Sequence, residues 1–364
     1  MLRTLALAND GGAHAPLYIL VTMFSPPSAT SAAPTAGEYR TVNDACGLLD
    51  CSERGKLALC GADAKRFLQG QVTNDIEALT AGNGCYAAFL TPKGKMLGDL
   101  RILDAGLVPV ARSASGLAVP GDARAVQLLL LDTERVALQE LFNMIRRFSV
   151  GYDVQLHKRT LECGLVALAG PAASSVAGAA DLPDREHAHC ELTLAGVGVR
   201  AIRTYLGVEL LCDAGDTETV RAALEANGAT PVSEAVIECL RVERGRPRYG
   251  VDLDETVIPQ EAGLNERAVS FTKGCYVGQE TVARLYYRGK PNRRLRGLLL
   301  SAPAQSDEQI DLDGRAVGRL GSVARSPELG PIALALVRRE APPGSAVAVG
   351  TEGVSAEVLE LPFR

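Results

Sequence analysis

The sequence predicts an α+β protein made of two related α/β subdomains and a C-terminal β-barrel. Two observations carry this prediction. A strand, a glycine and a helix follow one another at 56–69, and the same order returns about a hundred residues later at 165–180. From residue 295 onward, short runs of Val, Leu and Ala alternate with Gly or Pro, which is typical of a small barrel or sandwich. A length of 364 residues also fits two or three domains.

The first residues differ in composition from the rest of the chain. Their apolar run, 17–24, is shorter than the roughly 20 residues that a membrane span needs. Only Arg3 precedes it as a cation, alongside acidic Asp10, so the match to a signal peptide is poor. We expect a disordered leader at 1–36 with no membrane partner, and Met23 is an alternative start.

The first subdomain is expected to begin with a strand at 56–60, a turn at Gly61 and a helix at 62–69, with Asp63 in its first turn, where a carboxylate suits the helix dipole. A hairpin follows, with strands at 85–91 and 95–103 around Pro92-Lys93-Gly94. Residues 122–148 carry Leu, Val, Phe and Ile at helical spacing, so a helix is expected there.

The second subdomain is expected to open with a strand at 165–169 and a helix at 172–180, and to continue with strands at 199–203 and 207–212. A helix at 216–226 ends at Asn227-Gly228, and Ser233 opens another. The expected domains are therefore the leader at 1–36, a region at 37–290 that divides near 150–160, and the barrel at 291–364.

Composition and motifs exclude several classes of protein. The net charge of −5 argues against a wholly electrostatic nucleic-acid binder. Nine cysteines, with no C-x-x-C pair, fit neither a disulfide framework nor a zinc ribbon and favour a reducing compartment. The run His187-Ala-His189-Cys190 has no second ligand pair at a recognised spacing, so no metal site is expected. Common nucleotide-binding, zinc-protease and hydrolase motifs are also absent from the sequence.

One cysteine stands in an unusual context. Gly274 and Gly278 flank Cys275, and Glu280 falls in the first turn of a predicted helix that has apolar residues on one face. A thiol just before a helix N-terminus and beside Lys273 is expected to favour the thiolate. The other eight cysteines are expected to be packing residues.

This segment also carries a resemblance to a known family. Lys273, Gly274, Cys275, Tyr276, Gly278, Gln279 and Glu280 spell the K-G-C-Y-x-G-Q-E motif, which resembles that of the YgfZ family, folate-binding proteins related to the glycine-cleavage T-protein. Further segments resemble the family over roughly residues 40 to 364, namely 55–56, 61–63, 71–75, 91–95, 241–245, 249–255 and 259–264. The resemblance implies a T-protein-like folate-binding fold arranged around a central opening, with tetrahydrofolate or a derivative as cofactor. It also implies a cytoplasmic location, or a mitochondrial one in a eukaryote.

The resemblance further assigns a folate site. A carboxylate can accept two hydrogen bonds from the pterin edge, and the glutamate tail of folate needs cations. Glu209 resembles the T-protein glutamate that binds the pterin, Arg241 the arginine of the L-R-x-E-x-G segment, and Asn74 a residue of the site-lining loop. The match at Glu209 is partial, since the segment 203–206 lacks a glycine found in T-proteins.

Asp99 bears on whether chemistry occurs at this site. T-proteins carry two consecutive aspartates after the Pro-x-Gly turn, whereas here Gly98 precedes Asp99. A lone carboxylate can still orient a pterin or accept a proton. The resemblance therefore implies a folate-binding accessory protein, with Cys275 as functional thiol, that serves iron–sulfur enzymes or their assembly proteins and tRNA modification. The alternative is a folate-dependent aminomethyl or one-carbon transferase with Asp99 as a catalytic residue, and the sequence leaves open whether the protein is an enzyme.

A basic segment follows the cysteine. Between Arg241 and Arg296 there are 12 Lys and Arg against 7 Asp and Glu, and the cations of 284–296 are interleaved with Tyr286 and Tyr287. Such a segment can meet the folate tail, an acidic protein surface or RNA phosphates. A tRNA contact through 284–296 is therefore a third hypothesis, beside that of a solvated linker.

Overall fold

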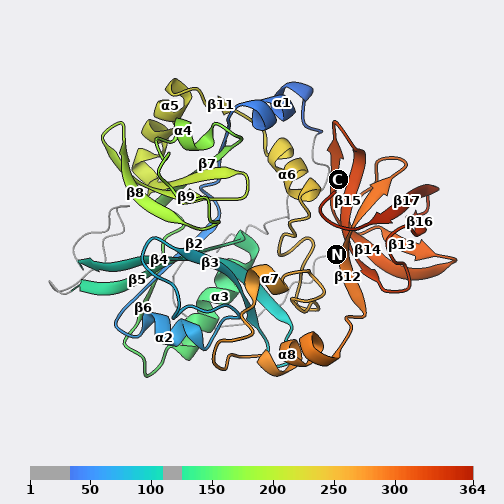
Figure 1. Ribbon diagram of the computed structural model, residues 1–364, viewed down its shortest axis with the longest axis horizontal. Helices are drawn as coiled ribbons and strands as arrows, with labels where there is room; N and C mark the ends of the chain where they lie inside the picture. Colours follow the sequence, from blue (N-terminus) through green and yellow to red (C-terminus); the bar gives the residue numbers. More distant parts are fainter. Residues whose placement is uncertain (1–32, 110–124, 364) are drawn as a thin grey trace, which may run out of the picture.

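Two β-sheets and a closed β-barrel organise the chain (Figure 1). The computed structural model describes residues 33–109 and 125–363. The predicted fold class is thereby confirmed. Residues 1–32 of the expected leader lie outside the described residues, and the first helix, α1 (Ala36–Asp44), is capped by Thr35, whose Oγ1 accepts a hydrogen bond from the backbone N–H of Glu38.

The first sheet has five strands in the order β3-β4-β5-β2-β6. Its strands are β2 (Gly55–Cys60), β3 (Gly84–Leu90), β4 (Met96–Pro109), β5 (Ala125–Thr133) and β6 (Gln155–Lys158), and its helices are α2 (Ala64–Gln69) and α3 (Arg135–Phe148). The hairpin of β3 and β4 and the helix after Gly61 agree with the prediction. A single helix over 122–148 is wrong, because 125–133 form the central strand and only 135–148 are helical.

The second sheet has six strands in the order β11-β1-β7-β10-β9-β8. Its strands are β1 (Gly47–Asp50), β7 (Cys163–Ala169), β8 (His189–Leu194), β9 (Val197–Arg203), β10 (Gly207–Asp213) and β11 (Thr230–Pro231). The helices beside it are α4 (Ala173–Val176), the 3-10 turn η1 (Ala214–Asp216) and α5 (Thr217–Ala226), so the helix expected at 172–180 is only one turn long. The expected division near 150–160 coincides with β6, the last strand of the first sheet, and β1, which precedes it in the chain, pairs with β7 of the second sheet.

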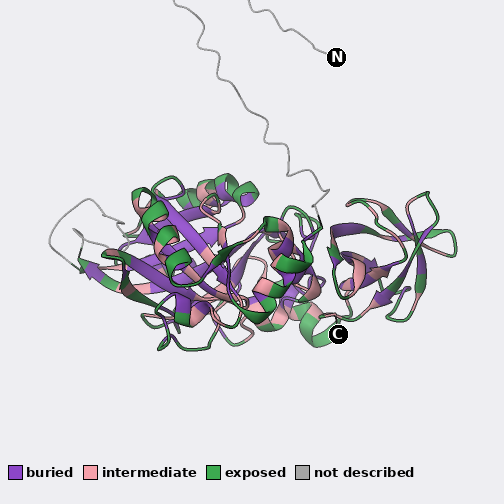
Figure 2. Ribbon diagram, turned by 90° about the horizontal axis from the view of Figure 1, so that it is seen from above, coloured by how far each residue is buried: buried purple, intermediate pink, exposed green. Residues whose placement is uncertain are grey.

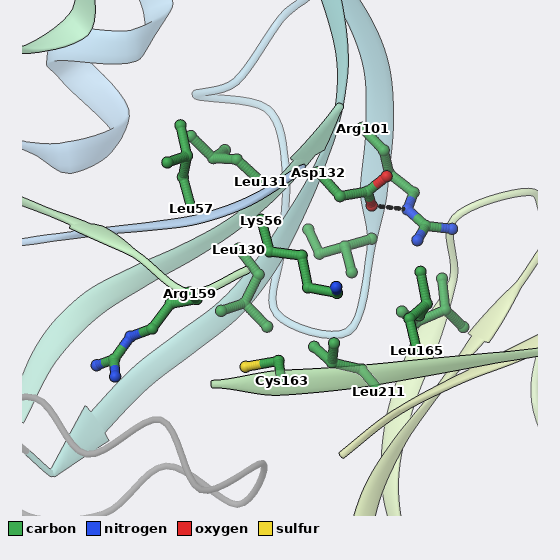
Figure 3. Close-up of a pocket in the computed structure, with 12 residues that line it drawn as sticks. Lys56, Leu57, Arg101, Leu130, Leu131, Asp132, Arg159, Cys163, Leu165 and Leu211 are labelled. Atoms are coloured by element: carbon green, nitrogen blue, oxygen red, sulfur yellow. Dashed lines mark hydrogen bonds and ion pairs between the residues drawn. The ribbon is translucent and has the colours of Figure 1, made fainter. Parts of the chain in front are cut away.

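The two sheets pack face to face through apolar side chains that both contribute, among them Ala58, Leu128, Leu165 and Leu211. Between them lies a cavity of about 20 Å³ beside Lys56, Asp132 and Cys163, shown in Figure 3. A cavity of this size has room for about one water molecule. A ligand larger than a water molecule must therefore bind elsewhere.

The barrel closes in the order β12-β15-β14-β13-β16-β17 and has an apolar core of its own. Its strands are β12 (Arg293–Leu300), β13 (Gln309–Leu312), β14 (Arg315–Ser326), β15 (Gly330–Arg338), β16 (Ala346–Val349) and β17 (Val354–Leu359). Figure 2 shows it standing to one side of the two sheets. Helix α6 (Glu234–Glu243), which opens after Ser233 as predicted, packs against β14 and lies between the second sheet and the barrel in Figure 1.

A long connection leads from α6 back to the first sheet and then to the barrel. It carries α7 (Asn265–Ala268), which packs against β3, and α8 (Gln279–Arg288). Its apolar side chains, such as Leu253 and Leu264, complete the core of the first sheet. Over 33–109 and 125–363, the structure contains no helix that is both long and apolar enough to cross a membrane.

Candidate functional site

The loop before α8 is fastened to the first sheet by Lys273. Its ammonium donates to the carbonyl oxygens of Gln69, Val72 and Asn74, at 2.6, 2.8 and 2.7 Å. These carbonyls lie at and just beyond the C-terminal end of α2, where the helix dipole favours a cation. Burial lowers the pKa of Lys273 to about 8. The structure therefore gives Lys273 an anchoring role.

Tyr276 and Gly278 hold the other side of the loop. Tyr276 is buried in the core of the first sheet, and its ring centroid lies 5.1 Å from Lys273 Nζ. Gly278 has φ of 84°, and a Cβ there would lie 2.6 Å from the carbonyl oxygen of Thr91. Only glycine combines this backbone conformation with so close an approach. The motif thus builds a loop that is pinned against the β3–β4 hairpin.

Cys275 is exposed between these anchors, as is Gly274. Gln279 and Glu280 begin α8, with Glu280 in its first turn, as the sequence predicted. All nine cysteines are free. The prediction that the other eight are packing residues is wrong for Cys190, which is also exposed. Cys163, by contrast, is buried between the sheets, and this burial raises the pKa of its thiol to about 12.

Asp99 lies on β4 and pairs with Tyr86 of the neighbouring strand β3. The Tyr86 hydroxyl donates to Asp99 Oδ2 at 2.5 Å, and Asp99 is 5% exposed. Burial raises the pKa of Asp99 to about 6, although the hydrogen bond from Tyr86 opposes the shift. A carboxyl that titrates this close to neutrality can exchange a proton with a bound molecule.

Gly98 faces the opposite side of β4, because successive residues of a strand point to opposite faces. A Cβ at Gly98 would lie 3.1 Å from a methyl carbon of Leu141, which belongs to α3. An aspartate at this position would point into the packed helix and away from Asp99. The strand therefore presents a single carboxylate at this point of the site.

Tyr86 begins a chain of contacts that joins both sheets. The guanidinium of Arg267 lies 5.0 Å from the Tyr86 ring, and that of Arg246 lies 4.7 Å from the ring of Tyr205. Both arginines pair with Glu186, Arg246 at 3.1 Å and Arg267 at 3.8 Å. We refer to these residues with Asp99 as the central cluster: Tyr86, Asp99, Glu186, Tyr205, Arg246 and Arg267. Two cations share one carboxylate here, which leaves positive charge for an anionic ligand.

Sequence reasoning missed most of the central cluster. Of its six residues only Asp99 was predicted, because Tyr86, Glu186, Tyr205 and the two arginines belong to no motif with a stated role. The one available signal was position: Arg246 directly follows the matched segment 241–245.

Asn74 holds the backbone of two residues of the central cluster. Its amide donates to the carbonyl oxygens of Tyr86, at 2.9 Å, and of Arg267, at 3.3 Å. Its Oδ1 accepts from the backbone N–H of Asp75 at 2.9 Å. The side chain thereby fixes the two segments that bring Tyr86 and Arg267 together. The structure gives Asn74 a positioning role.

Glu209 lies on β10 and faces the first sheet. Its Oε2 lies 2.7 Å from Arg101 of β4, which also pairs with Asp132, as Figure 3 shows. Glu209 Oε2 is buried and has no hydrogen-bond partner of good geometry among the described residues. A ligand donor that reached this oxygen would add a hydrogen bond beside the ion pair with Arg101. Burial raises the pKa of Tyr205, and the charge of Glu209 adds to this shift, so Glu209 acts electrostatically on a residue of the central cluster.

Arg241 has no donor left for a ligand. It is 7% exposed, and its five N–H groups go to both Glu238 oxygens, Asp252, Ser322 and the carbonyl of Arg246. A guanidinium has five donors, so all are used. Ser322 belongs to the barrel, and Arg241 therefore joins α6 to that domain. Arg246 and Arg267 are the cations that the central cluster offers.

A surface groove of about 560 Å³ reaches the central cluster at Tyr205. It runs along the ends of α1, α4 and α6 and the turn between β9 and β10, and its lining includes Arg203, Gly207 and Arg244. Its volume falls in the range of small-molecule sites. Among the described residues there is no group of three or more His, Cys, Asp or Glu placed to hold a metal ion.

The chain matches two known domain families. The GCVT N-terminal domain matches residues 13–108 and 124–273, and the glycine cleavage T-protein C-terminal barrel domain matches 293–364. A chloroplastic protein of Arabidopsis thaliana, which is named provisionally as a transferase, is 30% identical over 87% of this chain and 71% of its own length. The crystal structure of glycine cleavage system aminomethyltransferase T from Bartonella henselae has the same fold, with a TM-score of 0.75 and 22% identity over 90% of this chain and 89% of that one.

Proposed function

Because this chain belongs to the glycine-cleavage T-protein family, we propose that it is a folate-binding accessory protein of the YgfZ branch. In this proposal Cys275 is a functional thiol that maintains iron–sulfur enzymes and, through them, tRNA modification. The observation that carries the proposal is the motif loop, which buries Lys273 and Tyr276 and leaves Cys275 exposed between them. A merely structural cysteine would more often be buried.

Folate binding is supported by the chemistry of Glu209, Arg246 and Arg267. Glu209 offers a carboxylate oxygen whose 2.7 Å contact with Arg101 is an ion pair without good hydrogen-bond geometry. That oxygen can therefore still accept a hydrogen bond from the amino and ring N–H edge of a pterin. Arg246 and Arg267 offer cations for the carboxylates of the glutamate tail, which would replace Glu186 as their shared partner. The groove beside Tyr205 gives a molecule of this size a way in. The residues present therefore fit a tetrahydrofolate or a derivative of it.

Calorimetric titration of the full chain with tetrahydrofolate tests this assignment. Glu209→Gln, Arg246→Gln and Arg267→Gln should each weaken binding about tenfold or more, since each removes a charged hydrogen bond. Arg146→Gln, an exposed arginine on α3, is the matched control and should bind like the wild type. Wild-type affinity in all three site variants would contradict the proposed site.

The thiol is tested in cells that lack the endogenous protein. Cys275→Ser should fail to restore the activity of iron–sulfur enzymes while binding tetrahydrofolate normally, because Cys275 is exposed and is none of the residues assigned to folate. Cys190→Ser removes the other exposed cysteine and should restore activity fully. Full restoration by Cys275→Ser would overturn the role of the thiol and leave folate binding standing.

The second candidate function is a folate-dependent one-carbon transferase. It is favoured by the pKa of Asp99, about 6, which suits proton transfer near neutrality. Against it stands Gly98, because β4 presents only one carboxylate here and an aspartate at Gly98 would point toward Leu141 of α3, away from Asp99. Incubating the protein with tetrahydrofolate and an aminomethyl-loaded carrier protein decides the matter. Formation of methylenetetrahydrofolate that is lost in Asp99→Asn would establish the transferase.

A further inference from the structure

Three aromatic rings form an exposed platform on and beside α8. The rings of Phe271 and Tyr286 stack with centroids 3.8 Å apart and planes 18° apart, and Tyr287 meets Tyr286 edge-on at 5.0 Å. Tyr286 is 50% and Tyr287 68% exposed, the most of any Phe or Tyr in the described part of the chain. Aromatic side chains of this size are normally buried for the most part, so the platform is a candidate contact surface.

The platform is surrounded by cations that have no partner. Six Lys and Arg and no acidic residue stand between 281 and 296. Arg293 pairs with Glu261 and Arg296 with Glu360. The other four cations are all exposed and form no ion pair with any residue of 33–109 and 125–363: Arg284, Arg288, Lys290 and Arg294. We call these four and the three rings the α8 surface.

Helix geometry brings the two kinds of side chain together. Arg284, Tyr287 and Arg288 are three and four residues apart, so they share one face of α8. The backbone after α8 carries Lys290 and Arg294 onward to the barrel. Two arginines therefore share a helix face with the exposed ring of Tyr287, and two further cations follow along the chain toward the barrel.

This combination selects among anionic partners. An acidic protein or a lipid surface would satisfy the cations but has no flat aromatic group for exposed tyrosines. A nucleic acid duplex hides the faces of its bases within the stack. Unpaired nucleotides offer both a phosphate backbone and free base faces, and proteins bind them with cationic grooves and aromatic stacking. Cells contain unpaired nucleotides chiefly as RNA.

We propose that the α8 surface binds unpaired RNA, with bases stacked on Tyr286 and Tyr287 and phosphates held by Arg284, Arg288, Lys290 and Arg294. The proposal is independent of folate, since no residue of the α8 surface belongs to the central cluster. It also brings RNA beside the motif loop. Phe271 stacks on α8 at the start of that loop and Gly278 joins α8 at its end, with exposed Cys275 between them.

Fluorescence anisotropy with a labelled 12-nucleotide oligouridine, titrated with the full chain in 50 and 200 mM NaCl, tests the proposal. Tyr286→Ala/Tyr287→Ala should weaken binding about tenfold or more, whereas Tyr286→Phe/Tyr287→Phe keeps the rings and should bind normally. Arg284→Gln/Arg288→Gln should lower the slope of log Kd against log salt by about 1.4, because two phosphate contacts are lost.

The matched control lies on α3, which ends in Arg146, Arg147 and Phe148, all exposed. Arg146→Gln/Arg147→Gln/Phe148→Ala removes the same kinds of side chain and should leave oligouridine binding unchanged. Failure of the wild type to bind oligouridine in 50 mM NaCl overturns the proposal. The proposal is also overturned if the α3 control weakens binding equally, or if both α8 variants bind like the wild type. A preference for a 12-base-pair RNA duplex, oligothymidine, polyglutamate or anionic vesicles over oligouridine would overturn it as well.

Discussion

Asp99 is buried beside the half-buried Tyr86, and the protonation of its carboxyl makes folding depend on pH. The Asp99 carboxyl titrates near pH 3.8 in a solvated chain and, because burial raises its pKa, near pH 6 in the fold. Between these values the folded protein holds a proton that the unfolded chain has lost. Folding stability therefore falls as pH rises through this interval and stays lower above it.

Asp99→Asn removes this penalty, because the amide stays neutral and its oxygen can still accept from Tyr86. About two pKa units correspond to about 3 kcal/mol. We expect the variant to be more stable than the wild type by up to this amount at pH 7.5, and to match it near pH 4. Urea unfolding at the two pH values measures the difference. A stability change of the same size at both would contradict the account.

The sequence could name residues of the site but not their neighbours. The motif marks Cys275 because glycines and charges surround it within a few positions of the chain. Arg241 is equally visible, yet its acceptors include Asp252 and Ser322, which follow 11 and 81 residues later. Only the folded chain shows that these acceptors use every donor of Arg241. Only the folded chain, likewise, shows that Arg246 and Arg267 are candidates for binding an anionic ligand.

At the scale of elements, β5 shows where pattern reasoning fails. Its residues 128–131 are all leucine, and the strand lies in the middle of its sheet with both faces covered. Such a strand has no alternation of apolar and polar residues, so periodicity cannot distinguish it from a buried helix. The β3–β4 hairpin was predictable because Pro92-Lys93-Gly94 supplies a local turn signal.

The loop that carries Cys275 depends on backbone that only glycine adopts at Gly278. Gly278→Ala would place a Cβ 2.6 Å from the Thr91 carbonyl oxygen and force φ of 84° on an alanine. We expect a loss of roughly 1–2 kcal/mol or more and faster alkylation of Cys275 as the loop opens. Gly274→Ala is the control, since nothing lies within 4 Å of its Cβ. Urea unfolding measures the loss of stability, and the rate of reaction with iodoacetamide in a Cys190→Ser background measures the alkylation of Cys275. Equal effects of the two substitutions would refute the role of Gly278.

At the scale of the whole molecule, the buried ion pair of Arg241 and Asp252 helps to join the sheets to the barrel through Ser322. Asp252 is fully enclosed and accepts from Arg241 at 3.0 Å, from Arg248 N–H at 2.8 Å and from Ser322 N–H at 2.7 Å. A Cβ at neighbouring Gly321 would lie 2.4 Å from Asp252 Oδ1, so the barrel strand closes directly over the carboxylate. The composition of the sequence predicted the barrel as a separate domain, but no sequence pattern predicted that Asp252 and Arg241 would bind it.

Removing the cation should loosen the barrel from the rest of the protein. Arg241→Met leaves Asp252 charged and enclosed, which costs about 3–5 kcal/mol, and adding Asp252→Asn should recover part of that loss. Arg319→Met breaks an exposed pair with Asp307 on the barrel and should cost less than about 1 kcal/mol. Because the barrel has its own core, calorimetry of Arg241→Met should resolve two transitions where the wild type has one. A single transition, shifted no further than in Arg319→Met, would show that the pair does not couple the domains.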